Sequence, residues 1–415
     1  MKKPIPLLIL AIISFCIVLI SCNAQERYVP FFKCSNLLVE PYGICSHINR
    51  TGIWDEFDTK EHDLSMMDSV GVNFVRTDFD WVPMKTDDGS LNFQQLDSMV
   101  HSVSQHKRDI LGILTVDQRN YVSDDWLKYV EETSRRYRNQ IHFWEMLNEE
   151  EYIYKYVPGF YANQYVEFLK KGYIAVKKGN NKAIVLFSGV ANINIANIDT
   201  IFSQNVSSFF DIMNIHAYTW QDSEPEGFID YYRSLKARMS NYKIDKPVWL
   251  TETGASTYQE GGVSEAIQSE RVPRIYLISL ALGIEKVFWY KSRSCEMRPS
   301  EKEDHFGLWH KDYIPKPAYY AYKTLTQMCP NKSTRPRLKR FGSVFVASWK
   351  RPAGEYVWAF WTSRNTENVA VEFNTEVYKV YDISGNEIEI DFNNVEITPS
   401  IVYVTGPSKL SIEEK

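Results

Sequence analysis

The sequence of 415 residues lacks several features that mark common classes of protein function. It has no run of Lys and Arg and no basic stripe, and its net charge is −5, which argues against nucleic-acid binding. Only six cysteines and eight histidines are present. They form no CxxC pair and no His-rich set, and no calcium-binding loop occurs, so we expect neither a metal ion nor another cofactor.

Aromatic residues, by contrast, are plentiful. They make up 14% of the chain, while the hydrophobic share of 44% and the charged share of 24% are ordinary for a globular protein. Many aromatic rings can build a bulky core or a sugar site, because apolar sugar faces stack on flat rings. Composition alone leaves both interpretations open, and the length allows one large α/β domain plus a smaller one.

The N-terminus, MKKPIPLLILAIISFCIVLISCNAQ, has two lysines before an apolar run, which is typical of a secretory signal. Ser21 before Cys22 resembles a bacterial lipobox, which implies cleavage after residue 21, lipidation of Cys22 and a linker over 22–40. We expect an exported protein that is attached through this lipid alone to the bacterial outer membrane, on its periplasmic or cell-surface face. The alternative is an uncleaved anchor, but a run of about 17 residues is near the short limit for spanning.

The cysteines that remain after the signal and the lipid site show no metal-binding spacing. An exported chain can form a disulfide, but the sequence does not indicate which residues would pair. The four candidates are Cys34, Cys45, Cys295 and Cys329.

Eight short apolar segments recur at a mean spacing of about 35 residues, which predicts alternating strands and helices. They begin near Tyr42, Val72, Asp109, Ile141, Ala183, Asp211, Lys246 and Glu285. Helix-like stretches between them cover 96–105, 124–137, 161–178, 229–240 and 264–281. Eight β/α units predict an α/β fold, a TIM (β/α)8 barrel over 41–328. The alternative is a doubly wound open sheet, but no GxGxxG follows the first strand.

The pattern changes at about residue 335, where short alternating strands are separated by turn residues. This predicts a small C-terminal antiparallel β domain over 335–410. The segment has no cluster of His, Cys or carboxylates, so we expect a structural role, with carbohydrate binding as the alternative.

Two glutamates stand at predicted strand ends, Glu149 in FWEMLNE and Glu252 in PVWLTETG. The carboxyl ends of barrel strands form the active face, so both side chains should emerge there. Glycoside hydrolysis needs two carboxyl groups flanking the scissile bond, one as acid and one as nucleophile in a retaining enzyme. A charged neighbour raises the pKa of the acid member and keeps it protonated.

The segments WEMLNE and WLTETG resemble the acid/base and nucleophile segments of clan A glycoside hydrolases, closest in style to families 39 and 5. The resemblance covers about residues 40–325. It implies a retaining enzyme with Glu149 as acid/base, Glu252 as nucleophile and Asn148 as a partner for the sugar 2-hydroxyl. In much of the clan a proline follows the acid/base, whereas this chain has Glu150, which leaves the shape of that loop open.

Further positions agree with the resemblance. It implies that Arg76, at the end of the second strand, supports the nucleophile; the alternative is a structural ion pair with Glu145. His216 and Tyr218 resemble the clan's His-x-Tyr, in which the tyrosine hydroxyl orients the nucleophile. For both residues the alternative is a place in the core.

Several aromatic residues are candidates for contacts with sugar. The resemblance implies that Trp289, at the end of the eighth strand, floors the sugar site, with a core position as the alternative, and that His47 contacts a sugar hydroxyl. Loops on the predicted active face carry four further candidate stacking platforms, namely Trp81, Trp220, Tyr258 and Trp309.

The sequence therefore predicts a retaining hydrolase that cleaves β-glycosidic bonds in a poly- or oligosaccharide. The alternative is a non-catalytic, surface glycan-binding lipoprotein on the same barrel. Within WEMLNEEEY we expect Glu149 to face the barrel mouth. Glu150 and Glu151 should lie in a solvated loop, because acidic runs are usually surface, and Glu145 should need a buried partner such as Arg76.

Overall fold

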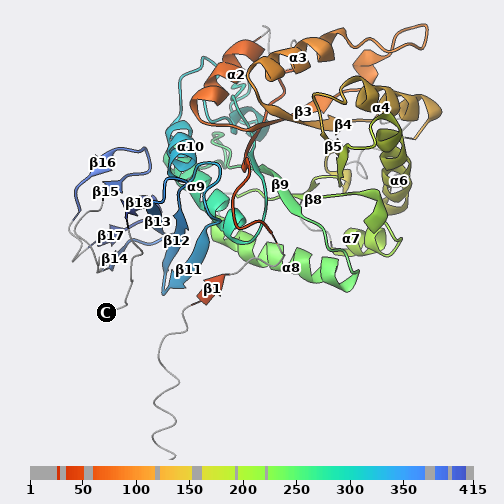
Figure 1. Ribbon diagram of the computed structural model, residues 1–415. Coiled ribbons are helices and arrows are strands. Elements are labelled where there is room, and N and C mark those ends of the chain that lie inside the picture. Colours follow the sequence, from red (N-terminus) through yellow and green to blue (C-terminus); the bar gives the residue numbers. More distant parts are fainter. Residues whose placement is uncertain are drawn as a thin grey trace, which may run out of the picture.

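A computed structural model describes residues 26–28, 34–50, 59–116, 122–151, 161–191, 195–219, 223–369, 379–390 and 395–407. It has two parts, a closed parallel sheet ringed by helices and a separate antiparallel sheet beside it (Figure 1). The predicted TIM barrel and C-terminal antiparallel β domain are both confirmed.

The barrel contains all eight predicted strand positions. Its sheet has the order β6-β5-β4-β3-β2-β10-β9-β8-β7, and isolated bridges from Leu186 to Ile212 and from Asn148 to Gly189 close it. The fifth position is split into β6 and β7 by residues 187–189. The strands are β2 (Tyr42–Cys45), β3 (Phe74–Phe79), β4 (Asp109–Leu114), β5 (Phe143–Met146), β6 (Ile184–Leu186), β7 (Val190–Ala191), β8 (Met213–His216), β9 (Val248–Thr253) and β10 (Val287–Trp289).

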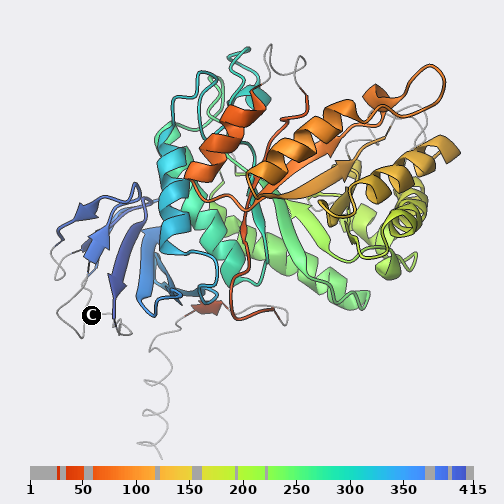
Figure 2. The ribbon, with the colours of Figure 1, turned by 45° about the horizontal axis from the view of Figure 1, so that its top comes forward.

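Helices cover the outside of the barrel (Figure 2). The five predicted helices agree with α3, α4, α6, α8 and α9 to within two residues at each end, whereas α2 and α7 were not predicted. The α-helices are α2 (Lys60–Ser69), α3 (Gln94–Gln105), α4 (Asp124–Arg136), α6 (Ala162–Gly179), α7 (Ile195–Phe202), α8 (Phe228–Asn241), α9 (Glu265–Ala281) and α10 (Pro317–Met328). Short 3-10 turns are η1 (Val82–Met84), η2 (Ser207–Phe209), η3 (Pro225–Gly227) and η4 (Lys302–His305).

Helix α4 shows why these segments are helical. The Ser123 side chain accepts a hydrogen bond from Trp126 N, which satisfies one of the free amides at the helix start. Acidic residues occupy the first turn and Arg135 and Arg136 the last, so both ends complement the helix dipole. Trp126 and Tyr129 are fully buried against the barrel.

The barrel interior is apolar near the amino ends of its strands and polar near their carboxyl ends. Phe74, Phe143, Trp249 and Phe288 come from different strands, and their rings contact one another within 5.0–6.1 Å. Side chains two positions further along a strand point to the same side. Polar residues at those positions on β3 and β5 therefore lie above this aromatic layer, toward the strand carboxyl ends.

Strand β9 breaks the regular alternation. Ile215 of β8 pairs with Leu250, but the next residue, His216, pairs with Glu252, so Thr251 is an extra residue in β9. Such a bulge re-aims the side chains that follow it. Both Thr251 Oγ1 and Glu252 Oε2 consequently approach His216, at 3.1 and 3.4 Å.

The second sheet has the order β1-β11-β12-β13-β18-β15-β16. Its first strand, β1 (Glu26–Tyr28), pairs with β11, so part of the segment 22–40 that we expected to be a linker belongs to this sheet. The others are β11 (Arg337–Phe341), β12 (Val344–Lys350), β13 (Tyr356–Thr362), β15 (Lys379–Tyr381), β16 (Glu387–Ile388) and β18 (Val402–Gly406), and a separate pair is formed by β14 (Glu367–Val369) and β17 (Val395–Ile397).

This sheet lies beside α9 and α10 of the barrel (Figures 1 and 2). Polar side-chain contacts attach it there. Trp349 Nε1 donates to Met328 O at 2.8 Å, at the end of α10. On α9, Arg274 Nε donates to Glu226 Oε1 at 3.0 Å and Arg274 Nη2 to Ser363 O at 3.2 Å. Trp361 Nε1 donates to the same Glu226 at 2.8 Å. The C-terminal domain therefore contacts the segment that follows β8, the strand that leads to the candidate site.

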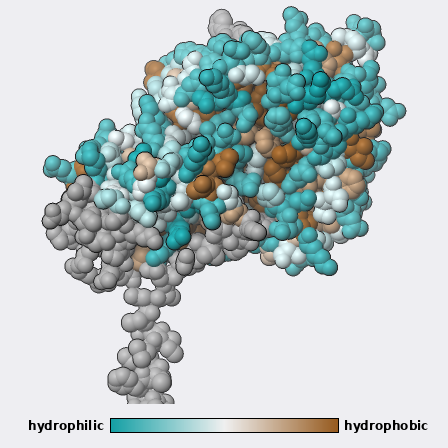
Figure 3. All heavy atoms as spheres, viewed as in Figure 1, coloured by the Kyte–Doolittle hydropathy of each residue, from teal (hydrophilic) through white to brown (hydrophobic). Residues whose placement is uncertain are grey.

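The exported, lipid-anchored form predicted from the N-terminus involves residues 1–25, which lie outside the described residues. None of the described helices is long and apolar enough to cross a membrane. The face shown in Figure 3 is largely hydrophilic, with hydrophobic residues in small separate groups. The four cysteines that we considered for disulfides, Cys34, Cys45, Cys295 and Cys329, are all free thiols.

Candidate active site

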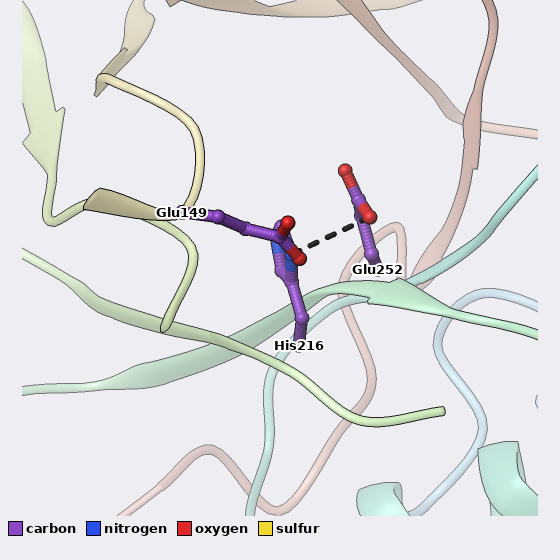
Figure 4. A group of neighbouring side chains, drawn as sticks. All are labelled: Glu149, His216 and Glu252. Carbon is purple, nitrogen blue, oxygen red and sulfur yellow. Dashed lines mark hydrogen bonds and ion pairs between the residues drawn. The ribbon is translucent and has the colours of Figure 1, made fainter. Parts of the chain in front are cut away.

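The two candidate catalytic glutamates meet at the end of the barrel formed by the carboxyl ends of its strands. Glu149 follows β5, Glu252 lies on β9, and their carboxyl groups converge next to the His216 ring (Figure 4). One carboxylate oxygen of each glutamate and one His216 ring nitrogen lie within 4.8 Å of one another. The Glu149 side chain is 17% exposed and that of Glu252 is 7% exposed, so solvent reaches Glu149 more easily.

Arg76 links the strands that carry these residues. Its Nε donates to Glu145 Oε2 at 2.7 Å, its Nη2 to Glu145 Oε1 at 2.8 Å and to Asn148 Oδ1 at 2.6 Å, and its Nη1 to Glu252 Oε1. The Arg76 and Glu145 side chains are 2% and 0% exposed. One guanidinium therefore pairs both with Glu145 and with the proposed nucleophile Glu252, so the two interpretations of Arg76 do not exclude each other.

The surroundings of Glu252 favour its charged form more than burial alone would. Burial raises the pKa of Glu252 above its ordinary value, and His216, the Arg76 guanidinium and the hydrogen bond from the Tyr218 hydroxyl offset this only in part. The Tyr218 hydroxyl donates to Glu252 Oε2. This is the contact that the resemblance implied for the tyrosine of the His-x-Tyr motif.

Glu149 has a different environment. Burial raises its pKa to about 7, with the Arg76 charge acting in the opposite direction. Burial also lowers the pKa of His216 to about 4, so the imidazole is neutral at neutral pH. His216 Nδ1 lies 2.7 Å from Glu149 Oε1, and its Nε2 lies 3.1 Å from Thr251 Oγ1. A protonated Glu149 can donate to Nδ1 while the Nε2–H donates to Thr251.

The turn that presents Glu149 has an unusual backbone. Leu147 and Glu149 have positive φ angles of 78° and 49°, a region that residues with side chains adopt rarely and at a cost. Asn148 lies between them, forms a parallel bridge with Gly189 and accepts a hydrogen bond from Arg76. The turn is therefore held by groups from β3 and from the break between β6 and β7.

His47 lies at the same end of the barrel. Its Nδ1 is 2.7 Å from Asp78 Oδ2, and its Nε2 is 3.4 Å from the hydroxyl of Tyr290, which directly follows β10. Asp78 also pairs with Arg50 at 3.0 Å. The ring of Tyr290 packs edge-on against that of Tyr218, with 6.0 Å between centroids. Sequence reasoning missed Tyr290, although it is the next residue after the candidate Trp289.

The prediction that Trp289 floors the sugar site is wrong. Trp289 is 1% exposed and its indole N–H donates to Phe306 O at 3.3 Å, so the ring belongs to the core. The half-buried ring at the end of β10 that borders Tyr218 is Tyr290 instead. Among the candidate platforms, Trp81 and Trp309 are buried, Tyr258 is half-buried and Trp220 lies outside the described residues.

The prediction of a solvated loop after Glu149 is also wrong. Glu150 is 1% exposed and accepts a hydrogen bond from Ser188 Oγ, and Glu151 is half-buried. Burial raises the pKa of both carboxyl groups. The acidic run is thus mostly interior, and its sequence offered no periodicity that would have shown this.

Glu149, His216 and Glu252 are close enough to one another to hold a divalent cation. The positive charge of Arg76 beside Glu252 disfavours binding of a metal cation there. In addition, the His216 nitrogen that faces Glu149 is already in contact with that carboxyl group. Two carboxyl groups with separate partners fit acid–base and nucleophilic chemistry without a metal.

No family model and no curated protein matches the chain in sequence. Solved structures with a similar fold include a family 39 glycoside hydrolase from the gut symbiont Bacteroides cellulosilyticus WH2, at 18% identity and a TM-score of 0.69, covering 91% of this chain and 82% of that one. A monomeric β-xylosidase from Caulobacter crescentus CB15 is 12% identical, with a TM-score of 0.66 and coverage of 92% and 99%. An α-L-arabinofuranosidase from Thermotoga maritima is 11% identical, with a TM-score of 0.59 and coverage of 92% and 100%. The predicted likeness of fold to clan A glycoside hydrolases is confirmed.

Replacing Arg76 by Met should lower the free energy of unfolding by about 3–5 kcal/mol, because Glu145 and Glu252 would be buried without their cation. The loss should be larger at pH 8 than at pH 5. The stranded carboxyl groups would have folded-state pKa values above their unfolded values, so stability falls as pH rises. Urea unfolding at the two pH values measures this.

The matched control is Arg233→Met, which breaks an exposed pair with Asp230 and should change stability by less than about 1 kcal/mol. An equal loss for Arg76→Met at both pH values would show that the buried charges are not the cause.

Proposed function

We propose that the protein is a retaining glycoside hydrolase that cleaves β-glycosidic bonds in a poly- or oligosaccharide. The main support is that one carboxylate oxygen of Glu149 and one of Glu252 lie within 4.8 Å of each other, at the barrel end where TIM-barrel enzymes have their active sites. Retaining enzymes hold their carboxyl groups about 5–5.5 Å apart, whereas inverting enzymes need about 6.5–9.5 Å to fit a water. Solved glycoside hydrolases of similar fold add support at the level of fold.

In the first step, a Glu252 carboxylate oxygen attacks the anomeric carbon and the bond to the leaving oxygen breaks. Glu149 gives its proton to that oxygen, so the leaving group departs as an alcohol. In the second step, Glu149 takes a proton from water, the resulting hydroxide attacks the anomeric carbon, and Glu252 is released as carboxylate. Two inversions at one carbon retain its configuration.

The division of roles follows from the surroundings of each carboxyl group. Glu149, with a pKa of about 7, keeps a proton to donate near neutral pH and can take one back. Glu252 accepts hydrogen bonds from Arg76 and Tyr218, which stabilise its charged form. Asn148 lies between Arg76 and Glu149, where its amide can reach the 2-hydroxyl of the reacting sugar.

A 2-deoxy-2-fluoro sugar with a dinitrophenyl leaving group should label Glu252 covalently, because the fluorine slows the second step. We would try the β-xylosyl, glucosyl, mannosyl and galactosyl forms and find the labelled peptide by mass spectrometry. Glu252→Gln should lose both labelling and turnover, by at least about 10⁴-fold for turnover. Glu285→Gln, at the opposite end of the barrel, is the matched control. Binding of glycans without labelling would favour the non-catalytic glycan-binding alternative.

The pH dependence of kcat/KM should be bell-shaped, with an alkaline limb near pH 7. Above that pH Glu149 loses the proton that it must donate, and at low pH Glu252 gains a proton and cannot attack. In Glu149→Gln, the alkaline limb should disappear when an activated aryl glycoside is the substrate. An unchanged alkaline limb in this variant would assign the titration to another group.

We further propose that Cys22 is lipidated and attaches the exported enzyme to the bacterial outer membrane. The support is the N-terminal signal pattern, with two lysines, an apolar run and Ser21 before Cys22. Expression in a bacterial host with radioactive palmitate should label the wild-type chain in the outer-membrane fraction but not Cys22→Ser. Equal labelling of both would exclude Cys22 as the site.

A further inference from the structure

Glu150 is a buried acid that neither proposed catalytic step uses. It directly follows Glu149, is 1% exposed and accepts a hydrogen bond from Ser188 Oγ. Burying a carboxyl group costs free energy unless it is paired. A residue next to the catalytic acid that carries this cost needs a compensating contact, and Ser188 provides it.

Ser188 is itself held in place. It lies in the break between β6 and β7, is fully buried, and its backbone N–H donates to the Tyr165 hydroxyl at 2.8 Å. The next residue, Gly189, donates its N–H to Glu145 Oε1 at 3.2 Å. The position of Ser188 is therefore restrained by its own hydrogen bond to α6 and by the hydrogen bond from Gly189 to Glu145, the ion-pair partner of Arg76.

The segment 188–189 also packs against His216, which in turn contacts Glu149. A side chain at position 189 would overlap the Nε2 side of the His216 ring, so glycine allows the backbone to pack directly on that imidazole. His216 in turn contacts Glu149 through Nδ1. The Glu149 carboxyl group thus rests on His216, and the residue after it is hydrogen-bonded to the segment behind His216.

The turn at Glu149 needs such restraint. Leu147 and Glu149 both have positive φ angles, at a cost of roughly 1–3 kcal/mol each, and such conformations persist only where surrounding contacts impose them. Asn148 is restrained by Arg76 and by its bridge to Gly189. On the other side of Glu149 the chain has no proline to stiffen the backbone, and the side chain of Glu150 accepts a hydrogen bond from Ser188 Oγ there.

We propose that Glu150 is a positioning residue whose hydrogen bond with Ser188 holds the turn in the orientation that aims Glu149 at the leaving-group oxygen. This rests on the proposed function. Glu150 acts through Glu149, so it affects only the part of the reaction that needs acid assistance. Its role requires a hydrogen-bond acceptor at this place and not a negative charge.

The substitutions follow from that requirement. Glu150→Gln keeps an acceptor for Ser188 Oγ and is the matched control, whereas Glu150→Met has similar volume but no acceptor. Ser188→Ala removes the donor from the other side and serves as an independent test if Glu150→Met folds poorly. We would measure kcat/KM, which reports formation of the glycosyl-enzyme, for a phenyl glycoside and a 2,4-dinitrophenyl glycoside of the same sugar.

Only the phenyl leaving group needs a proton, because dinitrophenolate departs without one. Glu150→Met and Ser188→Ala should each lower kcat/KM by about 10- to 100-fold for the phenyl glycoside, against about 10²–10⁴ for complete loss of acid catalysis. Both should stay within about twofold of wild type for the dinitrophenyl glycoside. The double variant should lose no more than either single one. Glu150→Gln should remain within about threefold of wild type on both substrates.

Three results would overturn the proposal. Equal losses on both substrates would mean a general structural role, and no loss on either would mean no role. A loss for Glu150→Gln as large as for Glu150→Met would mean that the charge matters and not the hydrogen bond. Failure of the proposed function is distinguishable, because then the wild-type protein would cleave neither glycoside and would take no label at Glu252.

Discussion

The buried guanidinium of Arg76 is the interaction on which the rest of the site depends. It donates to groups from the ends of two other strands, Glu145 and Asn148 on the β5 side and Glu252 on β9. A cation inside a barrel is costly unless its donors are satisfied, and the planar fork of arginine can serve several acceptors at once. The formal charges of Arg76, Glu145 and Glu252 sum to one excess negative charge. Under the proposed function, that charge is on the nucleophile, next to the anomeric carbon of the sugar, which becomes electron-poor in the transition state.

Under the proposed function, one residue type takes two roles in this site. Glu149 rests on a neutral His216 and keeps a proton near neutral pH, whereas Glu252 accepts hydrogen bonds from a cation and a phenol. The backbone adds to this difference. Glu149 sits in a turn with positive φ angles, and Glu252 is re-aimed by the bulge at Thr251. Both are local departures from regular structure, of the kind that stable scaffolds carry at functional positions.

The C-terminal sheet has a structural connection to this region. Arg274 and Trp361 both contact Glu226, which follows β8 and Tyr218 in the chain. The ion pair between Arg274 and Glu226 lies within the barrel, and the small domain adds hydrogen bonds from Trp361 Nε1 to Glu226 and from Arg274 to Ser363 O. The small domain therefore contacts the chain that follows Tyr218 as well as α9 and α10. Its first strand, residues 26–28, lies close in sequence to the proposed lipid site and belongs to this sheet.

The sequence by itself determined the eight strand positions, five helices, the β domain and the strand-end glutamates, because hydrophobic periodicity and barrel topology are local or repeating signals. It did not show that Trp289 is core, that Tyr290 is the ring beside Tyr218, or that Glu150 is buried. Trp289 donates a hydrogen bond to the Phe306 carbonyl from within the core, and buried Glu150 accepts one from Ser188, 38 residues away. Only the tertiary structure brings such partners together, so only it could separate a buried positioning acid from a solvated one.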